Sequence, residues 1–167
     1  MSLLRNWAVF LDRDGVINRN RDDYVKDVDE MEILPGVPKA INLLNTMNFK
    51  VVIISNQSAV SRGLITIEKL LEIHEFLKKE LLQNNAKIDG IYFCPHRPDD
   101  SCDCRKPKPT LILKAAKDLG INLSESYMIG DRESDMIAAE KAGVKFIPIE
   151  TDGNLLKVVR TFLDKNE

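Results

Sequence analysis

The sequence predicts a doubly wound α/β fold, and two observations carry this prediction. Short apolar runs rich in β-branched residues alternate along the chain with longer stretches of helical periodicity. The apolar runs are typical of strands that are buried on both faces of a parallel sheet. Strands that alternate with helices in this way form a mostly parallel sheet with helices packed on its faces.

The individual elements follow from this alternation. The predicted strands, in chain order, are 7–11, 50–55, 89–94, 127–130 and 145–149. The predicted helices are 36–48, 66–85, 110–120, 134–143 and about 153–164. The third and fourth helices both end on a glycine, which is a usual stop signal for a helix. Residues 18–34 form the most polar stretch, and we expect this loop to cover the functional site.

Length and charge narrow the possible classes of protein. With 167 residues, we expect one domain, 1–167, with a core of its own. The net charge of −2 argues against a general nucleic-acid or membrane surface, because either would need an excess of basic residues. No apolar run reaches the roughly 20 residues that cross a bilayer, and the first residues lack the pattern of a signal peptide. We therefore expect a cytoplasmic protein, and we expect it to act as a monomer.

Residues that can carry chemistry follow four of the predicted strands. They are Asp12 and Asp14, then Ser55, then Lys106, and finally Asp131 and Asp135. In a parallel sheet ligands bind beyond the carboxyl ends of the strands, so these side chains are expected to converge. Carboxylates beside a lysine indicate a Mg²⁺ site that accepts phosphate, and a carboxylate can itself attack phosphorus. Each motif alone could be a turn or a helix cap, but all four fall at one edge of the sheet.

All three cysteines and one of the two histidines fall within the loop 94–104. A disulfide is not favoured, because Cys102 and Cys104 are too close in the chain to pair easily. A packed cluster of thiols leaves His96 unexplained. Zinc explains all four side chains, because three cysteines and one histidine form a closed tetrahedral ligand set. We predict a structural zinc, bound by Cys94, His96, Cys102 and Cys104, that holds the residues after the loop in place.

The motifs VFLDRDGVIN, SNQS, RKP and IGDRESD, in this order, resemble the haloacid dehalogenase (HAD) phosphatase superfamily over nearly the whole chain. The segments SNQSAVSRG and CPHRPDDSCDCRKPKP are similar to D-glycero-D-manno-heptose 1,7-bisphosphate phosphatases and their histidinol-phosphate phosphatase relatives. The resemblance implies a Rossmann-like fold and a Mg²⁺-dependent phosphatase that acts through an aspartyl phosphate. The intervals 15–54 and 56–105 leave no room for a large cap domain.

The resemblance also implies a role for each matching residue. Asp12 would be the nucleophile, and Asp14 would protonate the leaving oxygen and then activate water. Mg²⁺ would bind Asp12, the backbone carbonyl of Asp14, and Asp131, whereas Asp135 would orient its neighbours. Ser55 would donate a hydrogen bond to the phosphoryl group, and Lys106 would neutralise it. The residues expected to contact substrate are Arg13, Asp22, Asp23, Tyr24, Asn56, Gln57, Ser58, Arg105 and Arg132.

The substrate is less well defined by sequence than the reaction. SNQSAVSRG favours a heptose 1,7-bisphosphate whose 7-phosphate is removed, with histidinol phosphate as the alternative. The loop NRDDYV lacks the glycine that usually precedes the tyrosine in the family. Because this loop is expected to contact the substrate, the difference bears on which substrate the protein accepts. A nucleic-acid 3′-phosphatase is disfavoured by the acidic balance, and a non-enzymatic zinc module by the complete set of catalytic residues. His74, in the middle of a predicted helix with no ligand partner in helical reach, is predicted to be structural.

Overall fold

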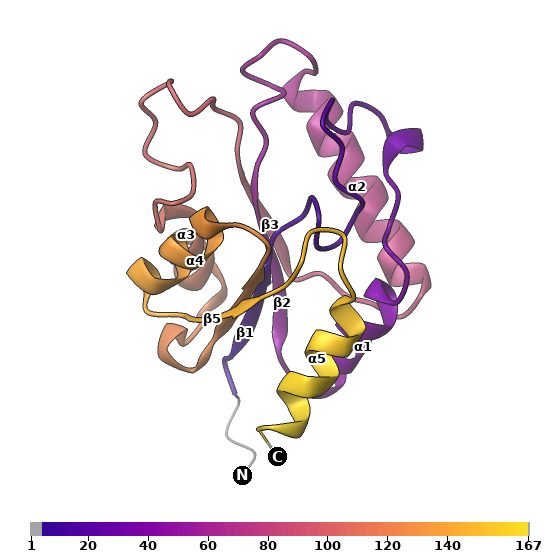
Figure 1. The fold of residues 1–167 in the computed structure, drawn as a ribbon, viewed down its shortest axis with the longest axis vertical. Helices are drawn as coiled ribbons and strands as arrows, with labels where there is room; N and C mark the ends of the chain where they lie inside the picture. The colour runs from indigo at the N-terminus through magenta and orange to yellow at the C-terminus, as the bar shows by residue number, and fades with distance from the viewer. Residues whose placement is uncertain (1–4, 167) are drawn as a thin grey trace.

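A computed structural model describes residues 5–166, and these contain a five-stranded, fully parallel sheet (Figure 1). The strands are β1 (Ala8–Leu11), β2 (Lys50–Asn56), β3 (Gly90–Cys94), β4 (Tyr127–Gly130) and β5 (Lys145–Pro148). Their order across the sheet is β3-β2-β1-β4-β5, and every neighbouring pair runs parallel. The predicted doubly wound α/β fold is therefore confirmed.

Five helices connect and follow the strands. They are α1 (Val37–Thr46), α2 (Ile67–Gln83), α3 (Thr110–Leu119), α4 (Glu133–Ala142) and α5 (Leu155–Asp164). The predicted bounds of helices and strands differ from these by one or two residues, mostly because capping residues had been counted as helix. Thr66, for example, caps α2 by accepting a hydrogen bond from the backbone N–H of Lys69. Two short 3₁₀ helices, Val28–Glu30 and Leu123–Glu125, had not been predicted.

The core lies in two layers, one on each face of the sheet. Val9 and Leu11 of β1 face a cluster that includes buried residues of α1, α2 and α5. Ala8 and Phe10 face the opposite cluster, which includes buried residues of α3 and α4. Figure 1 shows the same division, with α3 and α4 on one side of the sheet and α1, α2 and α5 on the other. Both faces of the central strand are thus removed from water, as its uninterrupted apolar sequence predicts.

The strand order reverses beside β1, the central strand. From β1 the chain passes outward through β2 and β3, and it then returns to β4 and β5 on the other side of β1. Such a reversal leaves a crevice at the carboxyl ends of the two strands that flank it. Asp12 begins its loop here, with its backbone N–H bonded to the carbonyl of Ile129 in β4 at 3.3 Å. Within residues 5–166 no helix is both long and apolar enough to cross a membrane.

Candidate active site

A polar cavity of about 380 Å³ opens at the carboxyl ends of the strands. This volume is in the range of sites that take small molecules. The cavity is lined by Asp12, Arg13, Asp14, Asn20, Arg21, Asp22, Tyr24, Val25, Asn56, Gln57, Ser58, Arg62, Arg105, Lys106, Arg132 and Ser134. The loop 18–34 supplies five of these residues, and it lies over the site as predicted.

Asp12 and Lys106 form a buried ion pair at the floor of the cavity. The Nζ atom of Lys106 lies 3.0 Å from Oδ1 of Asp12 and 2.6 Å from Oδ1 of Asp135, and it donates to the carbonyl of Ile54 at 2.8 Å. Burial raises the pKa of Asp12; the ammonium of Lys106 opposes the shift, and the carboxylates of Asp135 and Asp14 add to it. Burial alone would lower the pKa of Lys106, but the two carboxylates raise it, so the amine stays protonated. The residue therefore supplies a fixed positive charge beside the expected nucleophile.

Asp131 completes a cluster of carboxylates that fits a divalent cation. One oxygen each of Asp12, Asp131 and Asp135 lie within 4.8 Å of one another. Oδ2 of Asp131 accepts a hydrogen bond from Thr151 Oγ1 at 2.7 Å, whereas its Oδ1 is buried without a hydrogen-bond partner. Burial, together with the nearby Asp12, raises the pKa of Asp131. An unpartnered buried carboxylate oxygen in an acidic cluster is the environment that a hard cation such as Mg²⁺ satisfies.

Two glycines allow this cluster to close. Gly15 has a φ of +86°, and a Cβ atom there would lie 2.6 Å from Oδ2 of Asp131. At Gly130 a Cβ atom would lie 2.5 Å from the carboxyl group of Asp135. Asp135 itself is fully buried; its Oδ1 pairs with Lys106, and its Oδ2 accepts from the backbone N–H of Arg132 at 3.2 Å. These contacts occupy Asp135 with neighbouring groups, which agrees with the orienting role that the sequence predicts.

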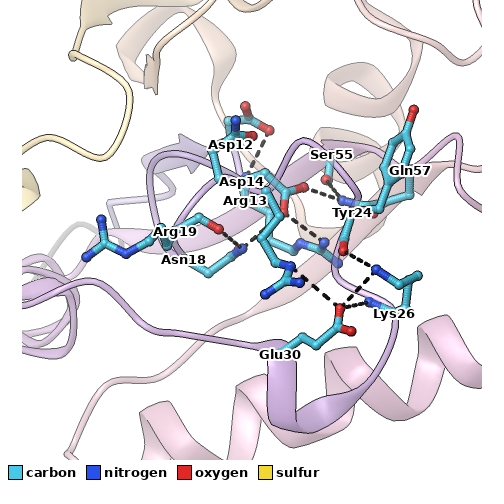
Figure 2. Close-up of polar contacts among 12 residues, drawn as sticks. Asp12, Arg13, Asp14, Asn18, Arg19, Tyr24, Lys26, Glu30, Ser55 and Gln57 are labelled. Carbon is cyan, nitrogen blue, oxygen red and sulfur yellow. Dashed lines mark hydrogen bonds and ion pairs between the residues drawn. The ribbon is translucent and has the colours of Figure 1, made fainter.

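Asp14 is held by three donors, as Figure 2 shows. Its Oδ1 accepts from Arg13 Nη2 at 2.9 Å and from Asn18 Nδ2 at 3.0 Å, and its Oδ2 accepts from Gln57 Nε2 at 2.6 Å. Burial alone would raise the pKa of Asp14, but the charge of Arg13 and the three hydrogen bonds outweigh burial and lower it. The carboxylate is therefore ionised and fixed in one orientation in the free protein.

The end of β2 supports the catalytic residues from the opposite side. Ser55 is fully buried, and its hydroxyl accepts from Gln57 Nε2 at 2.7 Å, so it lies behind Gln57 and outside the cavity lining. The side chain of Asn56 holds the backbone of Lys106: its Oδ1 accepts from the N–H at 3.0 Å, and its Nδ2 donates to the carbonyl at 3.2 Å. Asn56 thereby fixes the point at which Lys106 leaves the backbone.

Of the residues expected to contact substrate, the structure brings all but one to the cavity. Asp23 lies outside the lining; its exposed carboxylate pairs with Arg21 and Lys26. Arg13 belongs to the cavity wall, although its side chain is buried and directed at Asp14. Sequence reasoning missed two arginines of the lining, Arg21 and Arg62, and also Asn20, Val25 and Ser134. The signal for Arg62 was its position four residues after Ser58, whose hydroxyl it reaches at 3.3 Å through Nε.

The four predicted zinc ligands come together on one side of the cavity. Their ligand atoms lie within 4.8 Å of one another, and the three cysteines are free of disulfides. His96 Nδ1 lies 3.5 Å from Cys94 Sγ and 3.4 Å from Cys104 Sγ, and Cys94 Sγ lies 3.6 Å from Cys102 Sγ. Burial, and after it the neighbouring thiols, raise the pKa of Cys94, so a cation is what would stabilise this sulfur as a thiolate. Three thiols and an imidazole without an open position fit a closed structural zinc site.

This loop is joined directly to residues that are predicted to be catalytic or to bind substrate. The backbone carbonyl of Cys94 accepts from the N–H of Gln57 at 2.7 Å, and that of His96 accepts from Arg105 Nη1 at 3.0 Å. Lys106 follows two residues after Cys104, the last of the four ligands. The position of the lysine therefore depends on a loop with little apolar core of its own, which a bound metal would make rigid.

Known proteins resemble this chain in sequence and in fold. The haloacid dehalogenase-like hydrolase family matches residues 5–143. The D-glycero-beta-D-manno-heptose-1,7-bisphosphate 7-phosphatase of Helicobacter pylori (strain J99) is 45% identical over 84% of this chain and 80% of its own length. That of Escherichia coli (strain K12) is 41% identical over 82% and 75%.

A solved structure extends the similarity to three dimensions. The D,D-heptose 1,7-bisphosphate phosphatase of B. bronchiseptica, in complex with magnesium and phosphate, superposes with a TM-score of 0.89. It is 34% identical in sequence and covers 95% of this chain and 99% of its own. These similarities confirm the predicted superfamily and class of enzyme. The chain therefore belongs to the haloacid dehalogenase-like hydrolase family, as an enzyme that hydrolyses phosphoric monoesters.

Proposed function

We propose that this protein removes the 7-phosphate of D-glycero-D-manno-heptose 1,7-bisphosphate in a Mg²⁺-dependent reaction. The relatives at 41% and 45% identity carry this activity in their names, and they support the assignment. The observation that carries the proposal is the cavity itself. Asp12, Asp14 and Lys106 form its floor, and four arginines line the space around them: Arg21, Arg62, Arg105 and Arg132.

The side chains divide the reaction between them. Asp12 attacks phosphorus and forms an aspartyl phosphate. Asp14 takes up a proton from solvent when the negative charge of the bound phosphate raises its pKa, and it donates that proton to the departing sugar oxygen. Asp14 then removes a proton from the water that hydrolyses this intermediate, so that it regains the proton that it donated. Lys106 neutralises charge on the transferring group, and the hydroxyl of Ser55, next to Gln57, is its expected hydrogen-bond donor. Mg²⁺, bound by Asp12, Asp131 and the backbone carbonyl of Asp14, would supply further charge neutralisation.

The zinc site in this proposal is structural. Cys94, His96, Cys102 and Cys104 fill a tetrahedral coordination sphere and leave no position for water. The metal takes no part in the chemical steps, and its effect is to hold Arg105 and Lys106 in place. Small displacements of catalytic groups are enough to lower turnover markedly.

The arginines favour a bisphosphate over the alternative substrate. Histidinol phosphate carries one phosphate and a cationic amine, and that amine would meet guanidinium groups around the cavity. A second phosphate would be attracted by the same groups, because arginine binds phosphate oxygens through paired N–H donors. The other residues predicted to contact substrate line the cavity together with these arginines and offer hydrogen bonds to sugar hydroxyls. They are Asp22, Tyr24, Asn56, Gln57 and Ser58.

The proposal is tested by a comparison of three substrates. We expect kcat/KM for heptose 1,7-bisphosphate to exceed that for histidinol phosphate and for a DNA 3′-phosphate, with phosphate released from the 7-position as read by ³¹P NMR. The reaction should stop when Mg²⁺ is chelated. A preference for histidinol phosphate would overturn the sugar assignment while leaving the phosphatase chemistry in place.

The proposal also includes the oligomeric state, the cellular compartment and the partners of the enzyme. We infer a monomer that works in the cytoplasm on a small molecule, without nucleic acid or membrane partners. The net charge of −2 leaves no excess of basic residues for binding nucleic acid. Light scattering on the purified protein and fractionation of the source cell test these two inferences.

A further inference from the structure

His74 lies on α2, outside the cavity lining and outside both candidate metal clusters. It nevertheless contacts the loop that follows β1. Its side chain is buried, with 3% of the residue exposed. Its Nε2 atom lies 3.1 Å from Nη1 of Arg13, a residue 61 positions earlier in the chain. Sequence reasoning had treated His74 as a structural residue because no partner lay within helical reach. The partner comes from the loop after β1.

Arg13 connects His74 to Asp14. Its guanidinium is fully buried, with Nη2 bonded to Oδ1 of Asp14 at 2.9 Å, Nη1 at His74, and Nε without a hydrogen-bond partner. Because one N–H of this buried guanidinium lacks a hydrogen bond, few contacts fix the orientation of its plane, and each remaining contact contributes to that orientation. His74 and Asp14 therefore fix the orientation of Arg13 from opposite ends.

The chemistry of the contact sets the state of the imidazole. Arginine offers donors only, so Nε2 of His74 must accept, and the ring must be neutral. This state is favoured by the surroundings, since burial and the charge of Arg13 lower the pKa of His74 to about 3. The ring also packs against Phe93 of β3, with the ring centroids 5.5 Å apart. His74 is thus a rigid, neutral acceptor.

We propose that His74 is a positioning residue for acid catalysis: through Arg13 it holds the carboxyl group of Asp14 where it protonates the leaving oxygen. This inference rests on the proposed function, because it assumes that Asp14 acts on the leaving group. Loss of the acceptor leaves a second buried N–H of Arg13 unpaired. The guanidinium then turns toward other acceptors and carries Asp14 with it.

A positioning role and a purely structural role for His74 predict different kinetics. Substrates that differ in their leaving group distinguish the two roles. A sugar alkoxide needs protonation as it departs, whereas 2,4-dinitrophenolate departs without it. A misplaced acid therefore slows hydrolysis of an alkyl phosphate and leaves that of 2,4-dinitrophenyl phosphate unchanged. General damage to the site slows both. The parameter to compare is kcat/KM, because it covers the steps up to leaving-group departure and excludes the later hydrolysis of the aspartyl phosphate.

The experiment compares His74→Leu and His74→Gln with wild type, using the best alkyl phosphate of the substrate panel and the dinitrophenyl ester. We expect His74→Leu to lower kcat/KM for the alkyl ester by about 10-fold and to change that for the aryl ester less than twofold. His74→Gln, which keeps a neutral acceptor, should stay within about threefold of wild type on both esters. Ile73→Val, a buried neighbour on the same helix, is the matched control and should leave the ratio of the two values unchanged.

Equal losses on both esters, or no loss on the alkyl ester, would overturn the role of His74. If His74→Leu does not fold, His74→Ala takes its place, and the alkyl-to-aryl ratio is measured with and without added imidazole. Recovery of the ratio supports positioning, and no recovery in a folded variant contradicts it. The proposed function is judged separately, from the substrate preference of the wild-type enzyme, so the two can fail independently.

Discussion

Asp12 and Asp14 stand two residues apart after β1, yet their surroundings shift their acidities in opposite directions. Burial by itself raises a carboxyl pKa, and it acts on both groups. Asp12 shares the single ammonium of Lys106 with Asp135, and the net shift of its pKa is upward. Asp14 accepts from the guanidinium of Arg13 and from two side-chain amides, and the net shift is downward.

The difference shows that the partners of each carboxyl group, rather than burial, decide the direction in which its pKa shifts. Around Asp12 three carboxylates face one lysine, and this excess of negative charge is what a divalent cation completes. Around Asp14 the charges are balanced in the free protein. A bound phosphate would then add negative charge beside Asp14 and raise its pKa toward the value that a general acid needs.

The largest effect is expected from the nucleophile. Asp12→Asn should lower kcat by on the order of 10⁴-fold, because the amide cannot form the aspartyl phosphate. Steady-state release of phosphate measures this, with Asp29→Asn, an exposed aspartate of the loop 18–34, as the control. Substantial turnover in Asp12→Asn would show that Asp12 is not the nucleophile.

The stability of a Lys106 variant tests the balance of charge around Asp12. Lys106→Met should lower the free energy of unfolding by about 3–5 kcal/mol, because it leaves Asp12 and Asp135 buried without their cation. Adding Asp135→Asn should restore part of this loss. Urea unfolding in the absence of Mg²⁺ gives both values, and a loss below about 1 kcal/mol would mean that the pair is not desolvated as described.

The loop 94–104 is connected to both carboxylates. It sets the position of Lys106 beside Asp12, and the carbonyl of Cys94 holds the backbone of Gln57, which donates to Asp14. Cys102→Ser should lose the bound metal and lower kcat by about 100-fold, while the far-UV circular dichroism stays close to wild type. Metal content by mass spectrometry is read on the same samples. Asp103→Ser, a substitution at an exposed neighbour in the same loop, is the control and should keep both metal and activity. Full activity in a zinc-free enzyme would disconnect the loop from catalysis.

The smallest effect concerns His74, on the Asp14 side. Its folded pKa of about 3 lies below the ordinary value of 6.5, so between these values the unfolded chain binds the extra proton. Stability from this group is complete above pH 6.5 and declines as the pH falls, by roughly 1.4 kcal/mol per unit. We expect wild type to lose about 2 kcal/mol more than His74→Gln between pH 6.5 and pH 5.0 in urea unfolding. Parallel losses in the two proteins would show that His74 titrates normally.

The catalytic edge was predictable because it depends on local sequence. Each strand is a short apolar run, and the polar residue that follows it must emerge at the carboxyl end of a parallel sheet. The meeting of the three cysteines with His96 was predictable for a similar reason, since Cys94 and Cys104 belong to one short loop. Asp23 shows the limit: its neighbours in sequence line the cavity, but its own side chain turns outward to Lys26.

Long-range pairings were beyond the sequence. Nothing in the order of residues relates Asn56 to the backbone of Lys106, 50 positions later, or His74 to Arg13. Such contacts depend on where the helices settle on the sheet. Hydrophobic packing decides where the helices lie, and the identities of the polar residues do not reveal it.

The sequence by itself determined the strands, the order of the motifs and the kinds of group that meet at the site. These follow from periodicity and from the chain direction of a parallel sheet. Tertiary structure alone decided which donor serves which carboxylate, and hence that Asp12 and Asp14 differ. The physical reason is distance: a hydrogen bond forms only within a few tenths of an ångström of about 2.9 Å, a condition that packing meets and residue type does not specify.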